Sequence, residues 1–255
     1  VPDAPGKPVG ASLRNAVGEG CRRVRVLNDS TAALLGAHVH NPNITVALIL
    51  GTGINTCYAE QCRNIPKLSQ ENLSGTMIIS TEVGEFRGIP KTMFEEAVIR
   101  ASDAPELAHG EKQCAGAYLG EVIRAAWQEA VRLQVLPEAF SSPVSLPQIS
   151  DYLAEQLVYL PQNPEARQIA QVLIHRGAKV AAILTAATIL RSQPQGGQCS
   201  LVIEGSQYRK LTGFAEAFRK ELDQLLQPYG IEASIEQWED SCLTGAALAA
   251  FAEER

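Results

Sequence analysis

The run ALILGTGINTCY, residues 47–58, decides the fold class because it sets two apolar segments on either side of a glycine-rich turn. Its apolar start predicts a buried strand, and residues 54–59 predict a second strand. Gly51 and Gly53 let the backbone approach an anion closely, and Thr52 adds a hydroxyl to a row of N–H groups. The segment is therefore a candidate phosphate-binding turn, although an ordinary hairpin has the same pattern.

Working outward from this hairpin, apolar strand patterns and helical patterns alternate along the chain. Strands are predicted at 24–27, 44–50, 77–80, 199–203 and 232–235. Helices are predicted at 31–37, from 91 onward, at 166–190, at 214–226 and from 243 onward. A proline-rich stretch at 136–147 is predicted to be a surface excursion. This order predicts an α/β layered domain.

Composition excludes several classes of partner. The 255 residues carry a net charge of −6 without basic runs, which argues against nucleic acid and against an anionic membrane surface. No apolar stretch is expected to reach the roughly 20 residues that span a bilayer. The six cysteines form no Cys-x-x-Cys pair and the four histidines lie at no ligand spacing, so no protein-held metal is expected. Reduced thiols predict a cytoplasmic location.

Asn28 and Asp29 come directly after the first apolar run. A carboxylate at the end of a strand lies at the sheet edge where α/β folds commonly bind ligands. Asp29 is a candidate base that accepts the proton of an alcohol during phosphoryl transfer, with Asn28 beside it to hold a polyol. The alternative is that Asp29 only caps the helix that follows.

Three further segments place candidate ligand groups at strand or helix ends. Glu82 is followed by a glycine after the strand at 77–80, and Glu111 lies in the first turn of a predicted helix. Gly205 and Ser206 form a turn after the strand at 199–203. Each has an ordinary alternative, because glutamates are mostly surface residues and a carboxylate stabilises any helix N-terminus.

The order of these segments is more specific than any one of them. NDST at 28–31, GTGINTCY at 51–58, TEVGEF at 81–86 and EKQCAGAYLGEVIR at 111–124 together resemble the eukaryotic-type hexokinase and glucokinase family. The resemblance runs from about Gly10 to the end of the chain. It implies a ribonuclease-H-like, actin-like ATPase large lobe with a mixed central sheet flanked by helices. Residues 28–255 would form that lobe, and residues 1–27 would be a remnant of the small lobe.

The resemblance also implies roles for individual residues. Asp29 matches the base that deprotonates the sugar 6-hydroxyl, and the side chains that hold the other hydroxyls match Asn28, Asn55, Glu82 and Glu111. The nucleotide-binding positions match Gly51, Thr52, Gly53, Gly205 and Ser206, and Gly245 matches the start of the closing helix. The implied ligands are a hexose and ATP, with Mg²⁺ held mainly through the nucleotide and a second lobe. The implied reaction is the first step of glycolysis.

The chain departs from the family at several points. Val83 stands where the family has tryptophan, and Ala117 stands where it has methionine. The family's first phosphate loop and its Thr-Lys segment have no counterpart here, and both are expected upstream of Val1, which is taken as a cut. One alternative is a non-catalytic, regulatory module that binds sugar or nucleotide. Another is an actin-like ATPase that uses no sugar, which would not require Asn28, Asn55, Glu82 and Glu111 together.

Overall fold

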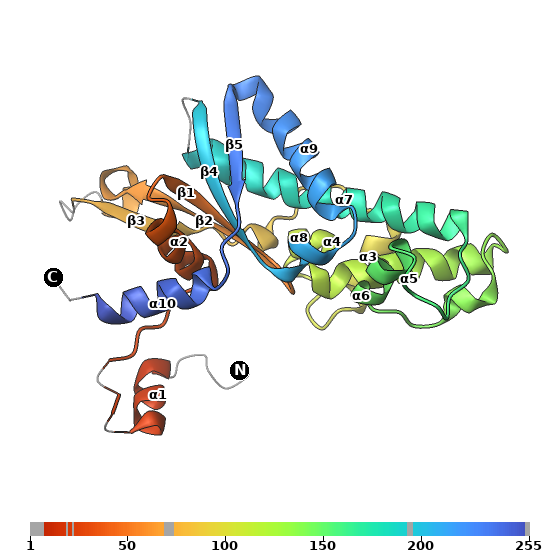
Figure 1. Cartoon of the computed structure of the whole chain (residues 1–255), viewed down its shortest axis with the longest axis horizontal. Helices are drawn as coiled ribbons and strands as arrows, with labels where there is room; N and C mark the ends of the chain where they lie inside the picture. Colours follow the sequence, from red (N-terminus) through yellow and green to blue (C-terminus); the bar gives the residue numbers. More distant parts are fainter. Residues whose placement is uncertain (1–7, 19, 22, 69–73, 193–195, 253–255) are drawn as a thin grey trace.

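A five-stranded mixed sheet with the strand order β3-β2-β1-β4-β5 forms the centre of the protein (Figure 1). The structure is a computed structural model that describes residues 8–18, 20, 21, 23–68, 74–192 and 196–252. The strands are β1 (Ile44–Leu50), β2 (Ile54–Gln61), β3 (Thr76–Ser80), β4 (Gly197–Glu204) and β5 (Ile231–Glu236). β1, β2 and β3 pair antiparallel, whereas β4 runs parallel to β1 and to β5.

Helices surround this sheet, as the α/β prediction requires. They are α1 (Val9–Val17), α2 (Asp29–His40), α3 (Met93–Ala101), α4 (His109–Cys114), α5 (Gly116–Arg132), α6 (Leu146–Leu153), α7 (Pro164–Ser192), α8 (Ser206–Lys210), α9 (Phe214–Leu226) and α10 (Ser241–Phe251). Short 3-10 turns are η1 (Cys62–Asn64), η2 (Pro66–Leu68), η3 (Val83–Glu85), η4 (Glu138–Ser141) and η5 (Gln227–Tyr229). The mixed sheet flanked by helices confirms the predicted α/β class.

β1 is apolar along its whole length because both of its faces are covered. Val46, Leu48 and Leu50 pack into the larger core, whereas Ile44 and Ala47 pack under α2. Strict alternation would put Ile44 and Val46 on the same face. The register between β1 and β4 shifts between these two residues, so Ile44 faces the opposite core.

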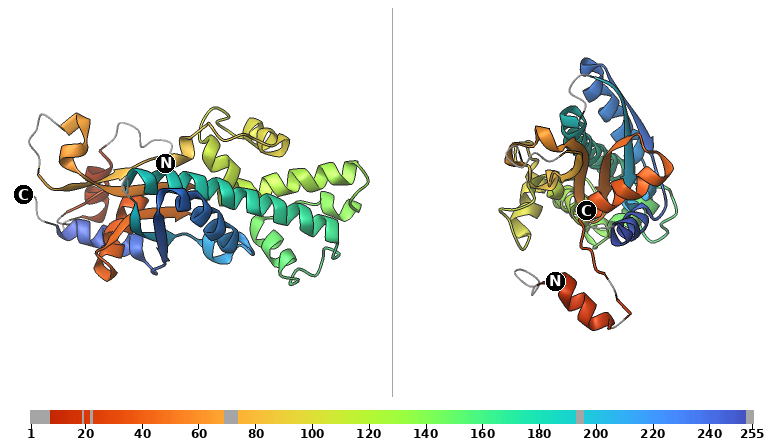
Figure 2. Two further views of the ribbon diagram at one scale, coloured as in Figure 1. Left: turned by 90° about the horizontal axis from the view of Figure 1, so that it is seen from above. Right: turned by 90° about the vertical axis from the view of Figure 1, so that its left-hand side faces the viewer.

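The two faces of the sheet carry different helix pairs. α2 packs on β1 with α10 against it, while α7 packs on the other face of β1 and β2, with α9 against it (Figures 1 and 2). α2 and α10 cross very closely at two glycines. A Cβ built on Gly36 would lie 2.0 Å from the Ser241 carbonyl oxygen, and one on Gly245 would lie 1.8 Å from the Ala32 carbonyl oxygen. Only glycine fits at either position.

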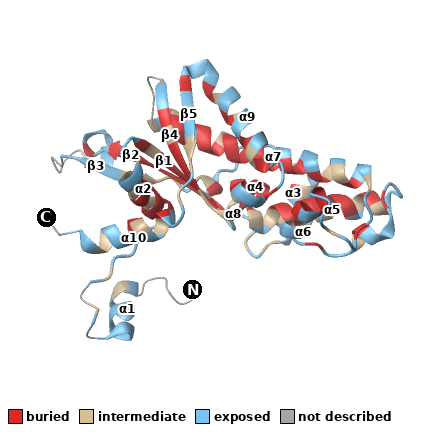
Figure 3. Cartoon of the chain, in the orientation of Figure 1, coloured by how far each residue is buried: buried red, intermediate tan, exposed pale blue. Residues whose placement is uncertain are grey.

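The helices α3 to α6 form an extension beyond the sheet, and Figure 3 shows that its interior is buried. Trp127 of α5 is fully buried and meets Phe140 and Tyr152 edge-on, with its Nε1–H donating to the Ala166 carbonyl oxygen at 2.9 Å. The prediction that residues 136–147 form only a surface excursion is therefore wrong, because Phe140 belongs to the core.

The segment before α2 differs from its predicted structure. α1 has no buried residue and lies apart from the body of the protein in Figure 1 and in the right-hand view of Figure 2. The strand predicted at 24–27 is wrong: these residues form no strand, and Val26 is 63% exposed. An apolar run becomes a strand only beside a pairing partner, and the described sheet offers none here. Residues 1–7, 19 and 22 of the predicted small-lobe remnant lie outside the described residues.

α7 is the long apolar helix predicted at 166–190, and it extends further at both ends. By length and composition alone it could cross a membrane, contrary to the expectation that no stretch approaches that length. Of its most apolar 18-residue window, 67% is buried inside the protein, between the sheet, α5 and α9. Its apolar character is that of a core helix packed between layers.

Candidate active site

The N-terminus of α2 presents two adjacent polar side chains at the edge of the sheet. Asn28 is the N-cap, and its Oδ1 accepts from the Ser30 backbone N–H at 3.0 Å and from the Ser30 hydroxyl at 2.6 Å. Asp29 is the first residue of the helix and also accepts from the Ser30 N–H, at 2.8 Å. The cap is thus Asn28 rather than Asp29. The Asp29 carboxylate is exposed in the first turn, where the helix dipole favours its negative charge.

Asn55 of β2 links this helix end to the end of β3. Its side chain is buried, and its Nδ2 donates to the Ser80 hydroxyl at 3.0 Å, to Glu82 Oε1 at 3.1 Å and more weakly to Asn28 Oδ1 at 3.4 Å. Its Oδ1 accepts from the backbone N–H groups of Thr56 and Glu82. An amide can do this because it both donates and accepts. Three segments distant in sequence thereby meet at one side chain.

Glu82 has a left-handed backbone, with φ 52° and ψ 45°, which is uncommon for a residue with a side chain. The N–H bond to Asn55 Oδ1 and the carboxylate bonds to Asn55 and Ser80 hold it in this conformation. The carboxylate is exposed. A conformation that the surroundings enforce at a polar surface is a feature that clusters at ligand-binding sites.

Glu111 of α4 lies on the other side of the β1–β2 turn. Its Oε2 accepts from the Ile54 N–H at 3.2 Å, and its side chain fills the space beside two glycines. A Cβ on Gly53 would lie 2.4 Å from Oε2, and one on Gly84 would lie 3.2 Å from the Glu111 Cβ. Burial raises the pKa of the Glu111 carboxyl, and the negative charges of nearby glutamates raise it further, against the lowering effect of the Ile54 N–H.

The Gly51–Gly53 turn is anchored to the start of α5. The Gly51 carbonyl oxygen accepts from the Gly116 N–H at 2.8 Å, and the Thr52 carbonyl oxygen accepts from the Ala117 N–H at 3.1 Å. Because the two carbonyls are bound to α5, the position of the turn is fixed before any ligand arrives.

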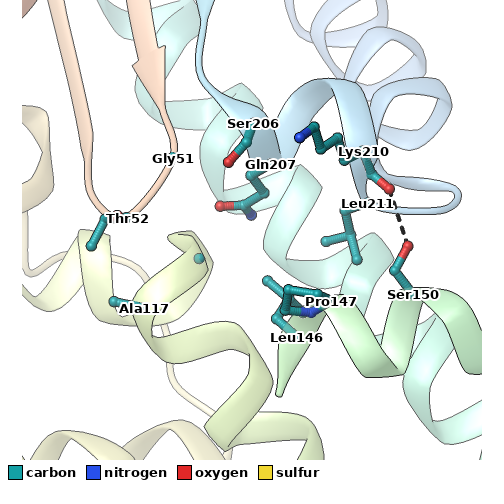
Figure 4. A pocket seen from close by; sticks show the side chains of 11 residues that line it. Gly51, Thr52, Ala117, Leu146, Pro147, Ser150, Ser206, Gln207, Lys210 and Leu211 are labelled. Carbon is teal, nitrogen blue, oxygen red and sulfur yellow. Dashed lines mark hydrogen bonds between the residues drawn. The ribbon is translucent and has the colours of Figure 1, made fainter.

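A pocket opens beside this turn, between β1, α5, α6 and α8 (Figure 4). Its volume is about 250 Å³, and it is lined by Gly51, Thr52, Gly116, Ala117, Leu146, Pro147, Ser150, Ser206, Gln207, Lys210 and Leu211. Gly205 has φ 131° and lies against β1, since a Cβ there would be 2.1 Å from the Leu50 carbonyl oxygen. β1 and β4 are parallel, so both strand ends reach the same sheet edge, where α/β folds bind ligands.

The residues singled out from the sequence therefore form two adjoining groups. The polar group joins Asn28, Asn55 and Glu82 by hydrogen bonds, with Asp29 adjacent in sequence and Glu111 beside Gly53. The pocket group contains Gly51, Thr52 and Ser206, with Gly205 at its edge. The β1–β2 turn connects the two groups. Gly245 instead serves the α2–α10 crossing described above.

Several residues of the site were missed from sequence. Ser80 and Ser30 complete the polar group, and Gln207 and Lys210 line the pocket. Lys210 carried a usable signal, since a cation shortly after a strand and a glycine turn suits a phosphate ligand. Among the described residues, no group of three or more His, Cys, Asp or Glu could hold a metal ion.

α10 is also tied to this site. The Cys242 N–H donates to the Glu204 carboxylate at 3.0 Å, and its thiol donates to the Asp29 carbonyl oxygen at 3.3 Å. Burial, together with Glu204 and Asp29, raises the pKa of the Cys242 thiol to about 12. The sulfur therefore stays protonated near neutral pH and serves as a structural donor between the two helices.

Comparison with known proteins gives a consistent match. The family model described as Hexokinase matches residues 45–252. Hexokinase-like 1 protein of Arabidopsis thaliana is 42% identical over 123 residues, which are 47% of this chain and 25% of that protein. Hexokinase-7 of rice (Oryza sativa subsp. japonica) is 29% identical over an alignment that covers 100% of this chain and 63% of that protein. The chain thus spans less than two thirds of the length of these relatives.

The fold agrees with these sequence matches. A hexokinase from Schistosoma mansoni, solved in complex with glucose, superposes with a TM-score of 0.74 at 23% identity, covering 89% of this chain and 58% of that one. This similarity confirms the expected fold, a ribonuclease-H-like lobe of the actin-like ATPase type with a mixed central sheet.

Proposed function

This chain belongs to the hexokinase family, and from that membership we propose that it takes part in the ATP-dependent phosphorylation of a glucose-like hexose at its 6-hydroxyl. In this proposal Asp29 is the general base. Asn28, Asn55, Glu82 and Glu111 hold the sugar, and the nucleotide lies along the pocket beside the Gly51–Gly53 turn. The reaction would be the entry step of glycolysis.

One observation carries the proposal: Asn55 binds Asn28 and Glu82 at the same time, beside the base. A sugar presents alternating donors and acceptors on neighbouring hydroxyls, and the amide and carboxylate groups here supply both functions. A hydroxyl held by these groups would lie near the Asp29 carboxylate, which can accept its proton as the phosphoryl group arrives. Phosphoryl transfer depends mainly on such positioning and on charge stabilisation.

The phosphates would be held in the pocket, on the side of the β1–β2 turn away from the proposed sugar site. The turn is fixed by its bonds to α5, and Lys210 adds a positive charge in the same pocket. The described residues hold no cluster of three metal ligands, so the proposal has Mg²⁺ arrive on the phosphates, where it would neutralise their charge during transfer.

We propose further that full activity needs a second lobe. Asn28, Asp29 and Glu82 are all exposed. Hydrogen bonds to a sugar at an open surface gain little over those to water, and closure by a second lobe would strengthen them by excluding water.

A cytoplasmic location is proposed as well, supported by six free cysteines, four of them buried.

The test uses the full-length protein in a coupled assay of glucose phosphorylation. Asp29→Asn is expected to lower kcat about 10²-fold, the scale typical of a lost general base, while glucose binding persists. Asp223→Asn, an exposed change on α9, serves as the control. Near-normal turnover in Asp29→Asn would contradict the base assignment. Sugar binding without turnover in the wild type would favour the non-catalytic module instead.

A further inference from the structure

Gln207 is a buried polar residue at the floor of the nucleotide pocket, only 5% exposed. Its Nε2 donates to the Cys114 carbonyl oxygen at 2.6 Å. Among the residues that the structure describes, its Oε1 has no hydrogen-bond partner although it is shielded from solvent. Buried acceptors are nearly always paired in folded proteins, so an unpaired one at a binding pocket points to a missing donor.

The direction of this amide is fixed by chemistry. Oxygen and nitrogen of a glutamine side chain can often be exchanged without changing its shape. Here the partner on one side is the Cys114 carbonyl oxygen, which can only accept. The nitrogen must therefore face Cys114, and the oxygen must face the other way.

The free oxygen faces the pocket. Figure 4 shows the Gln207 side chain beside that of Ser206, with its oxygen on the side of the turn at Gly51 and Thr52. A Cβ built on Gly116, another lining residue, would lie 3.3 Å from Oε1. The same Cβ would lie 2.7 Å from the Gly51 carbonyl oxygen, so a side chain at position 116 would crowd both the turn and the acceptor.

We propose that Gln207 positions the nucleotide by accepting a hydrogen bond from a ribose hydroxyl; this inference rests on the proposed nucleotide site. Phosphate oxygens cannot satisfy Oε1, because ionised phosphate offers no donor. The apolar residues Leu146, Pro147 and Leu211 line the end of the pocket away from the turn and suit the flat base. With phosphates at the turn and the base at that end, the ribose lies between them, beside Ser206 and Gln207.

The experiment measures nucleotide affinity by calorimetry on the full-length protein. The ligands are ATP, 2′-deoxy-ATP, 3′-deoxy-ATP and the triphosphate of purine riboside, which lacks the 6-amino group. One deoxy analogue is expected to bind about 3- to 10-fold more weakly than ATP, the scale of one neutral hydrogen bond. Gln207→Leu is expected to weaken the binding of ATP by a similar factor and to remove the difference in affinity between ATP and that deoxy analogue. Gln224→Leu, an exposed change on α9, should alter neither.

The outcomes separate the inference from the proposed function. Equal wild-type affinity for ATP and both deoxy analogues overturns the role of Gln207, and that comparison does not depend on any variant folding. Discrimination that persists in Gln207→Leu overturns it as well. A Gln207-dependent preference for the 6-amino group assigns the acceptor to the base and overturns the ribose assignment. A wild type that binds no ATP overturns the nucleotide site itself.

Discussion

Asn55 binds Glu82 through both ends of its amide, donating to the Glu82 carboxylate at 3.1 Å and accepting from the Glu82 backbone N–H at 3.0 Å. These residues are 27 positions apart, on β2 and after β3. The pair holds a glutamate in a left-handed conformation at the point where the proposed sugar site lies.

Asn55→Asp tests this arrangement with almost no change of shape. The new carboxylate cannot donate, and it would repel the Glu82 carboxylate. We expect glucose affinity to fall about 10-fold and the free energy of unfolding to fall by about 1–3 kcal/mol, as when a buried hydrogen bond loses one partner. Calorimetry and urea denaturation measure the two effects. Asn43→Asp, at an exposed position before β1, is the control, and unchanged affinity in Asn55→Asp would refute the sugar-site assignment.

Gly53→Ala tests the contact between the turn and Glu111. The added methyl group would occupy the place of Glu111 Oε2 and push the carboxylate away from the Ile54 N–H. The carboxylate is the end of a flexible side chain, so we expect glucose affinity to fall more than stability. Binding and thermal unfolding of the full-length protein give the comparison. Gly10→Ala, on exposed α1, is the control and should change neither quantity. A large loss of stability in Gly53→Ala would show instead that Gly53 is needed for folding.

Glu111→Gln tests the raised pKa of the Glu111 carboxyl. The folded protein holds this proton more tightly than the unfolded chain, whose carboxyl has a pKa near 4.5. The carboxyl's penalty on stability is therefore absent below that value, develops as the pH rises through the folded pKa, and stays at higher pH. We expect Glu111→Gln to be more stable than the wild type at pH 7 to 8, with the difference vanishing as the pH falls toward 4.5.

Unfolding curves of both proteins across this pH range provide the check. The hydrogen bond and charge of Arg132 lower the pKa of the Glu129 carboxyl, so Glu129→Gln should give no stabilisation at any pH and serves as the control of opposite sign. If Glu111→Gln and the wild type were equally stable at every pH, the ionised Glu111 carboxylate would be solvated by water and would carry no burial penalty.

Gly245→Ala tests the crossing of α2 and α10. The new methyl group meets the Ala32 carbonyl oxygen, which belongs to helix backbone and cannot move alone. Overpacking of this kind costs about 1–3 kcal/mol, and we expect a corresponding loss in urea denaturation. Because α2 carries Asn28 and Asp29, turnover should fall as well. Ala246→Ser, at the exposed neighbouring position, should leave both unchanged; a fully stable Gly245→Ala protein would mean that the helices can separate freely.

The sequence predicts the sheet well because its strands have local signals. The hairpin at 47–58 is readable from apolar runs and glycines, and the long buried helix from its alanine content. The strand predicted at 24–27 fails for the same reason, since a local apolar run says nothing about whether a pairing partner exists. The sequence suggests Asp29 as the cap of α2, whereas the structure has Asn28 there, and the local pattern does not choose between them because asparagine and aspartate cap helices about equally well.

The contents of the site are less predictable than its location. Local patterns mark Glu82 and Glu111 as candidate ligand groups, but only the resemblance to a known family adds Asn55 and joins the three in one site, because no local pattern reveals that they meet. Gln207 directly follows Gly205 and Ser206, yet no sequence pattern marks it as a site residue. The role proposed for Gln207 rests on the burial of its Oε1 and on the absence of a hydrogen-bond partner for it among the described residues. A sequence pattern predicts neither property.

The close packing of α10 on α2 also bears on when the proposed base becomes functional during biosynthesis. Asp29 is synthesised before residues 241–251, yet the helix that begins with it packs against those residues, and its carbonyl oxygen is bound by Cys242. β1 in turn needs β4 as its parallel neighbour. Such distant contacts form slowly, because a long loop must close before they stabilise anything. A nascent chain that has not yet emerged as far as residue 251 therefore carries the base without the support that orients it.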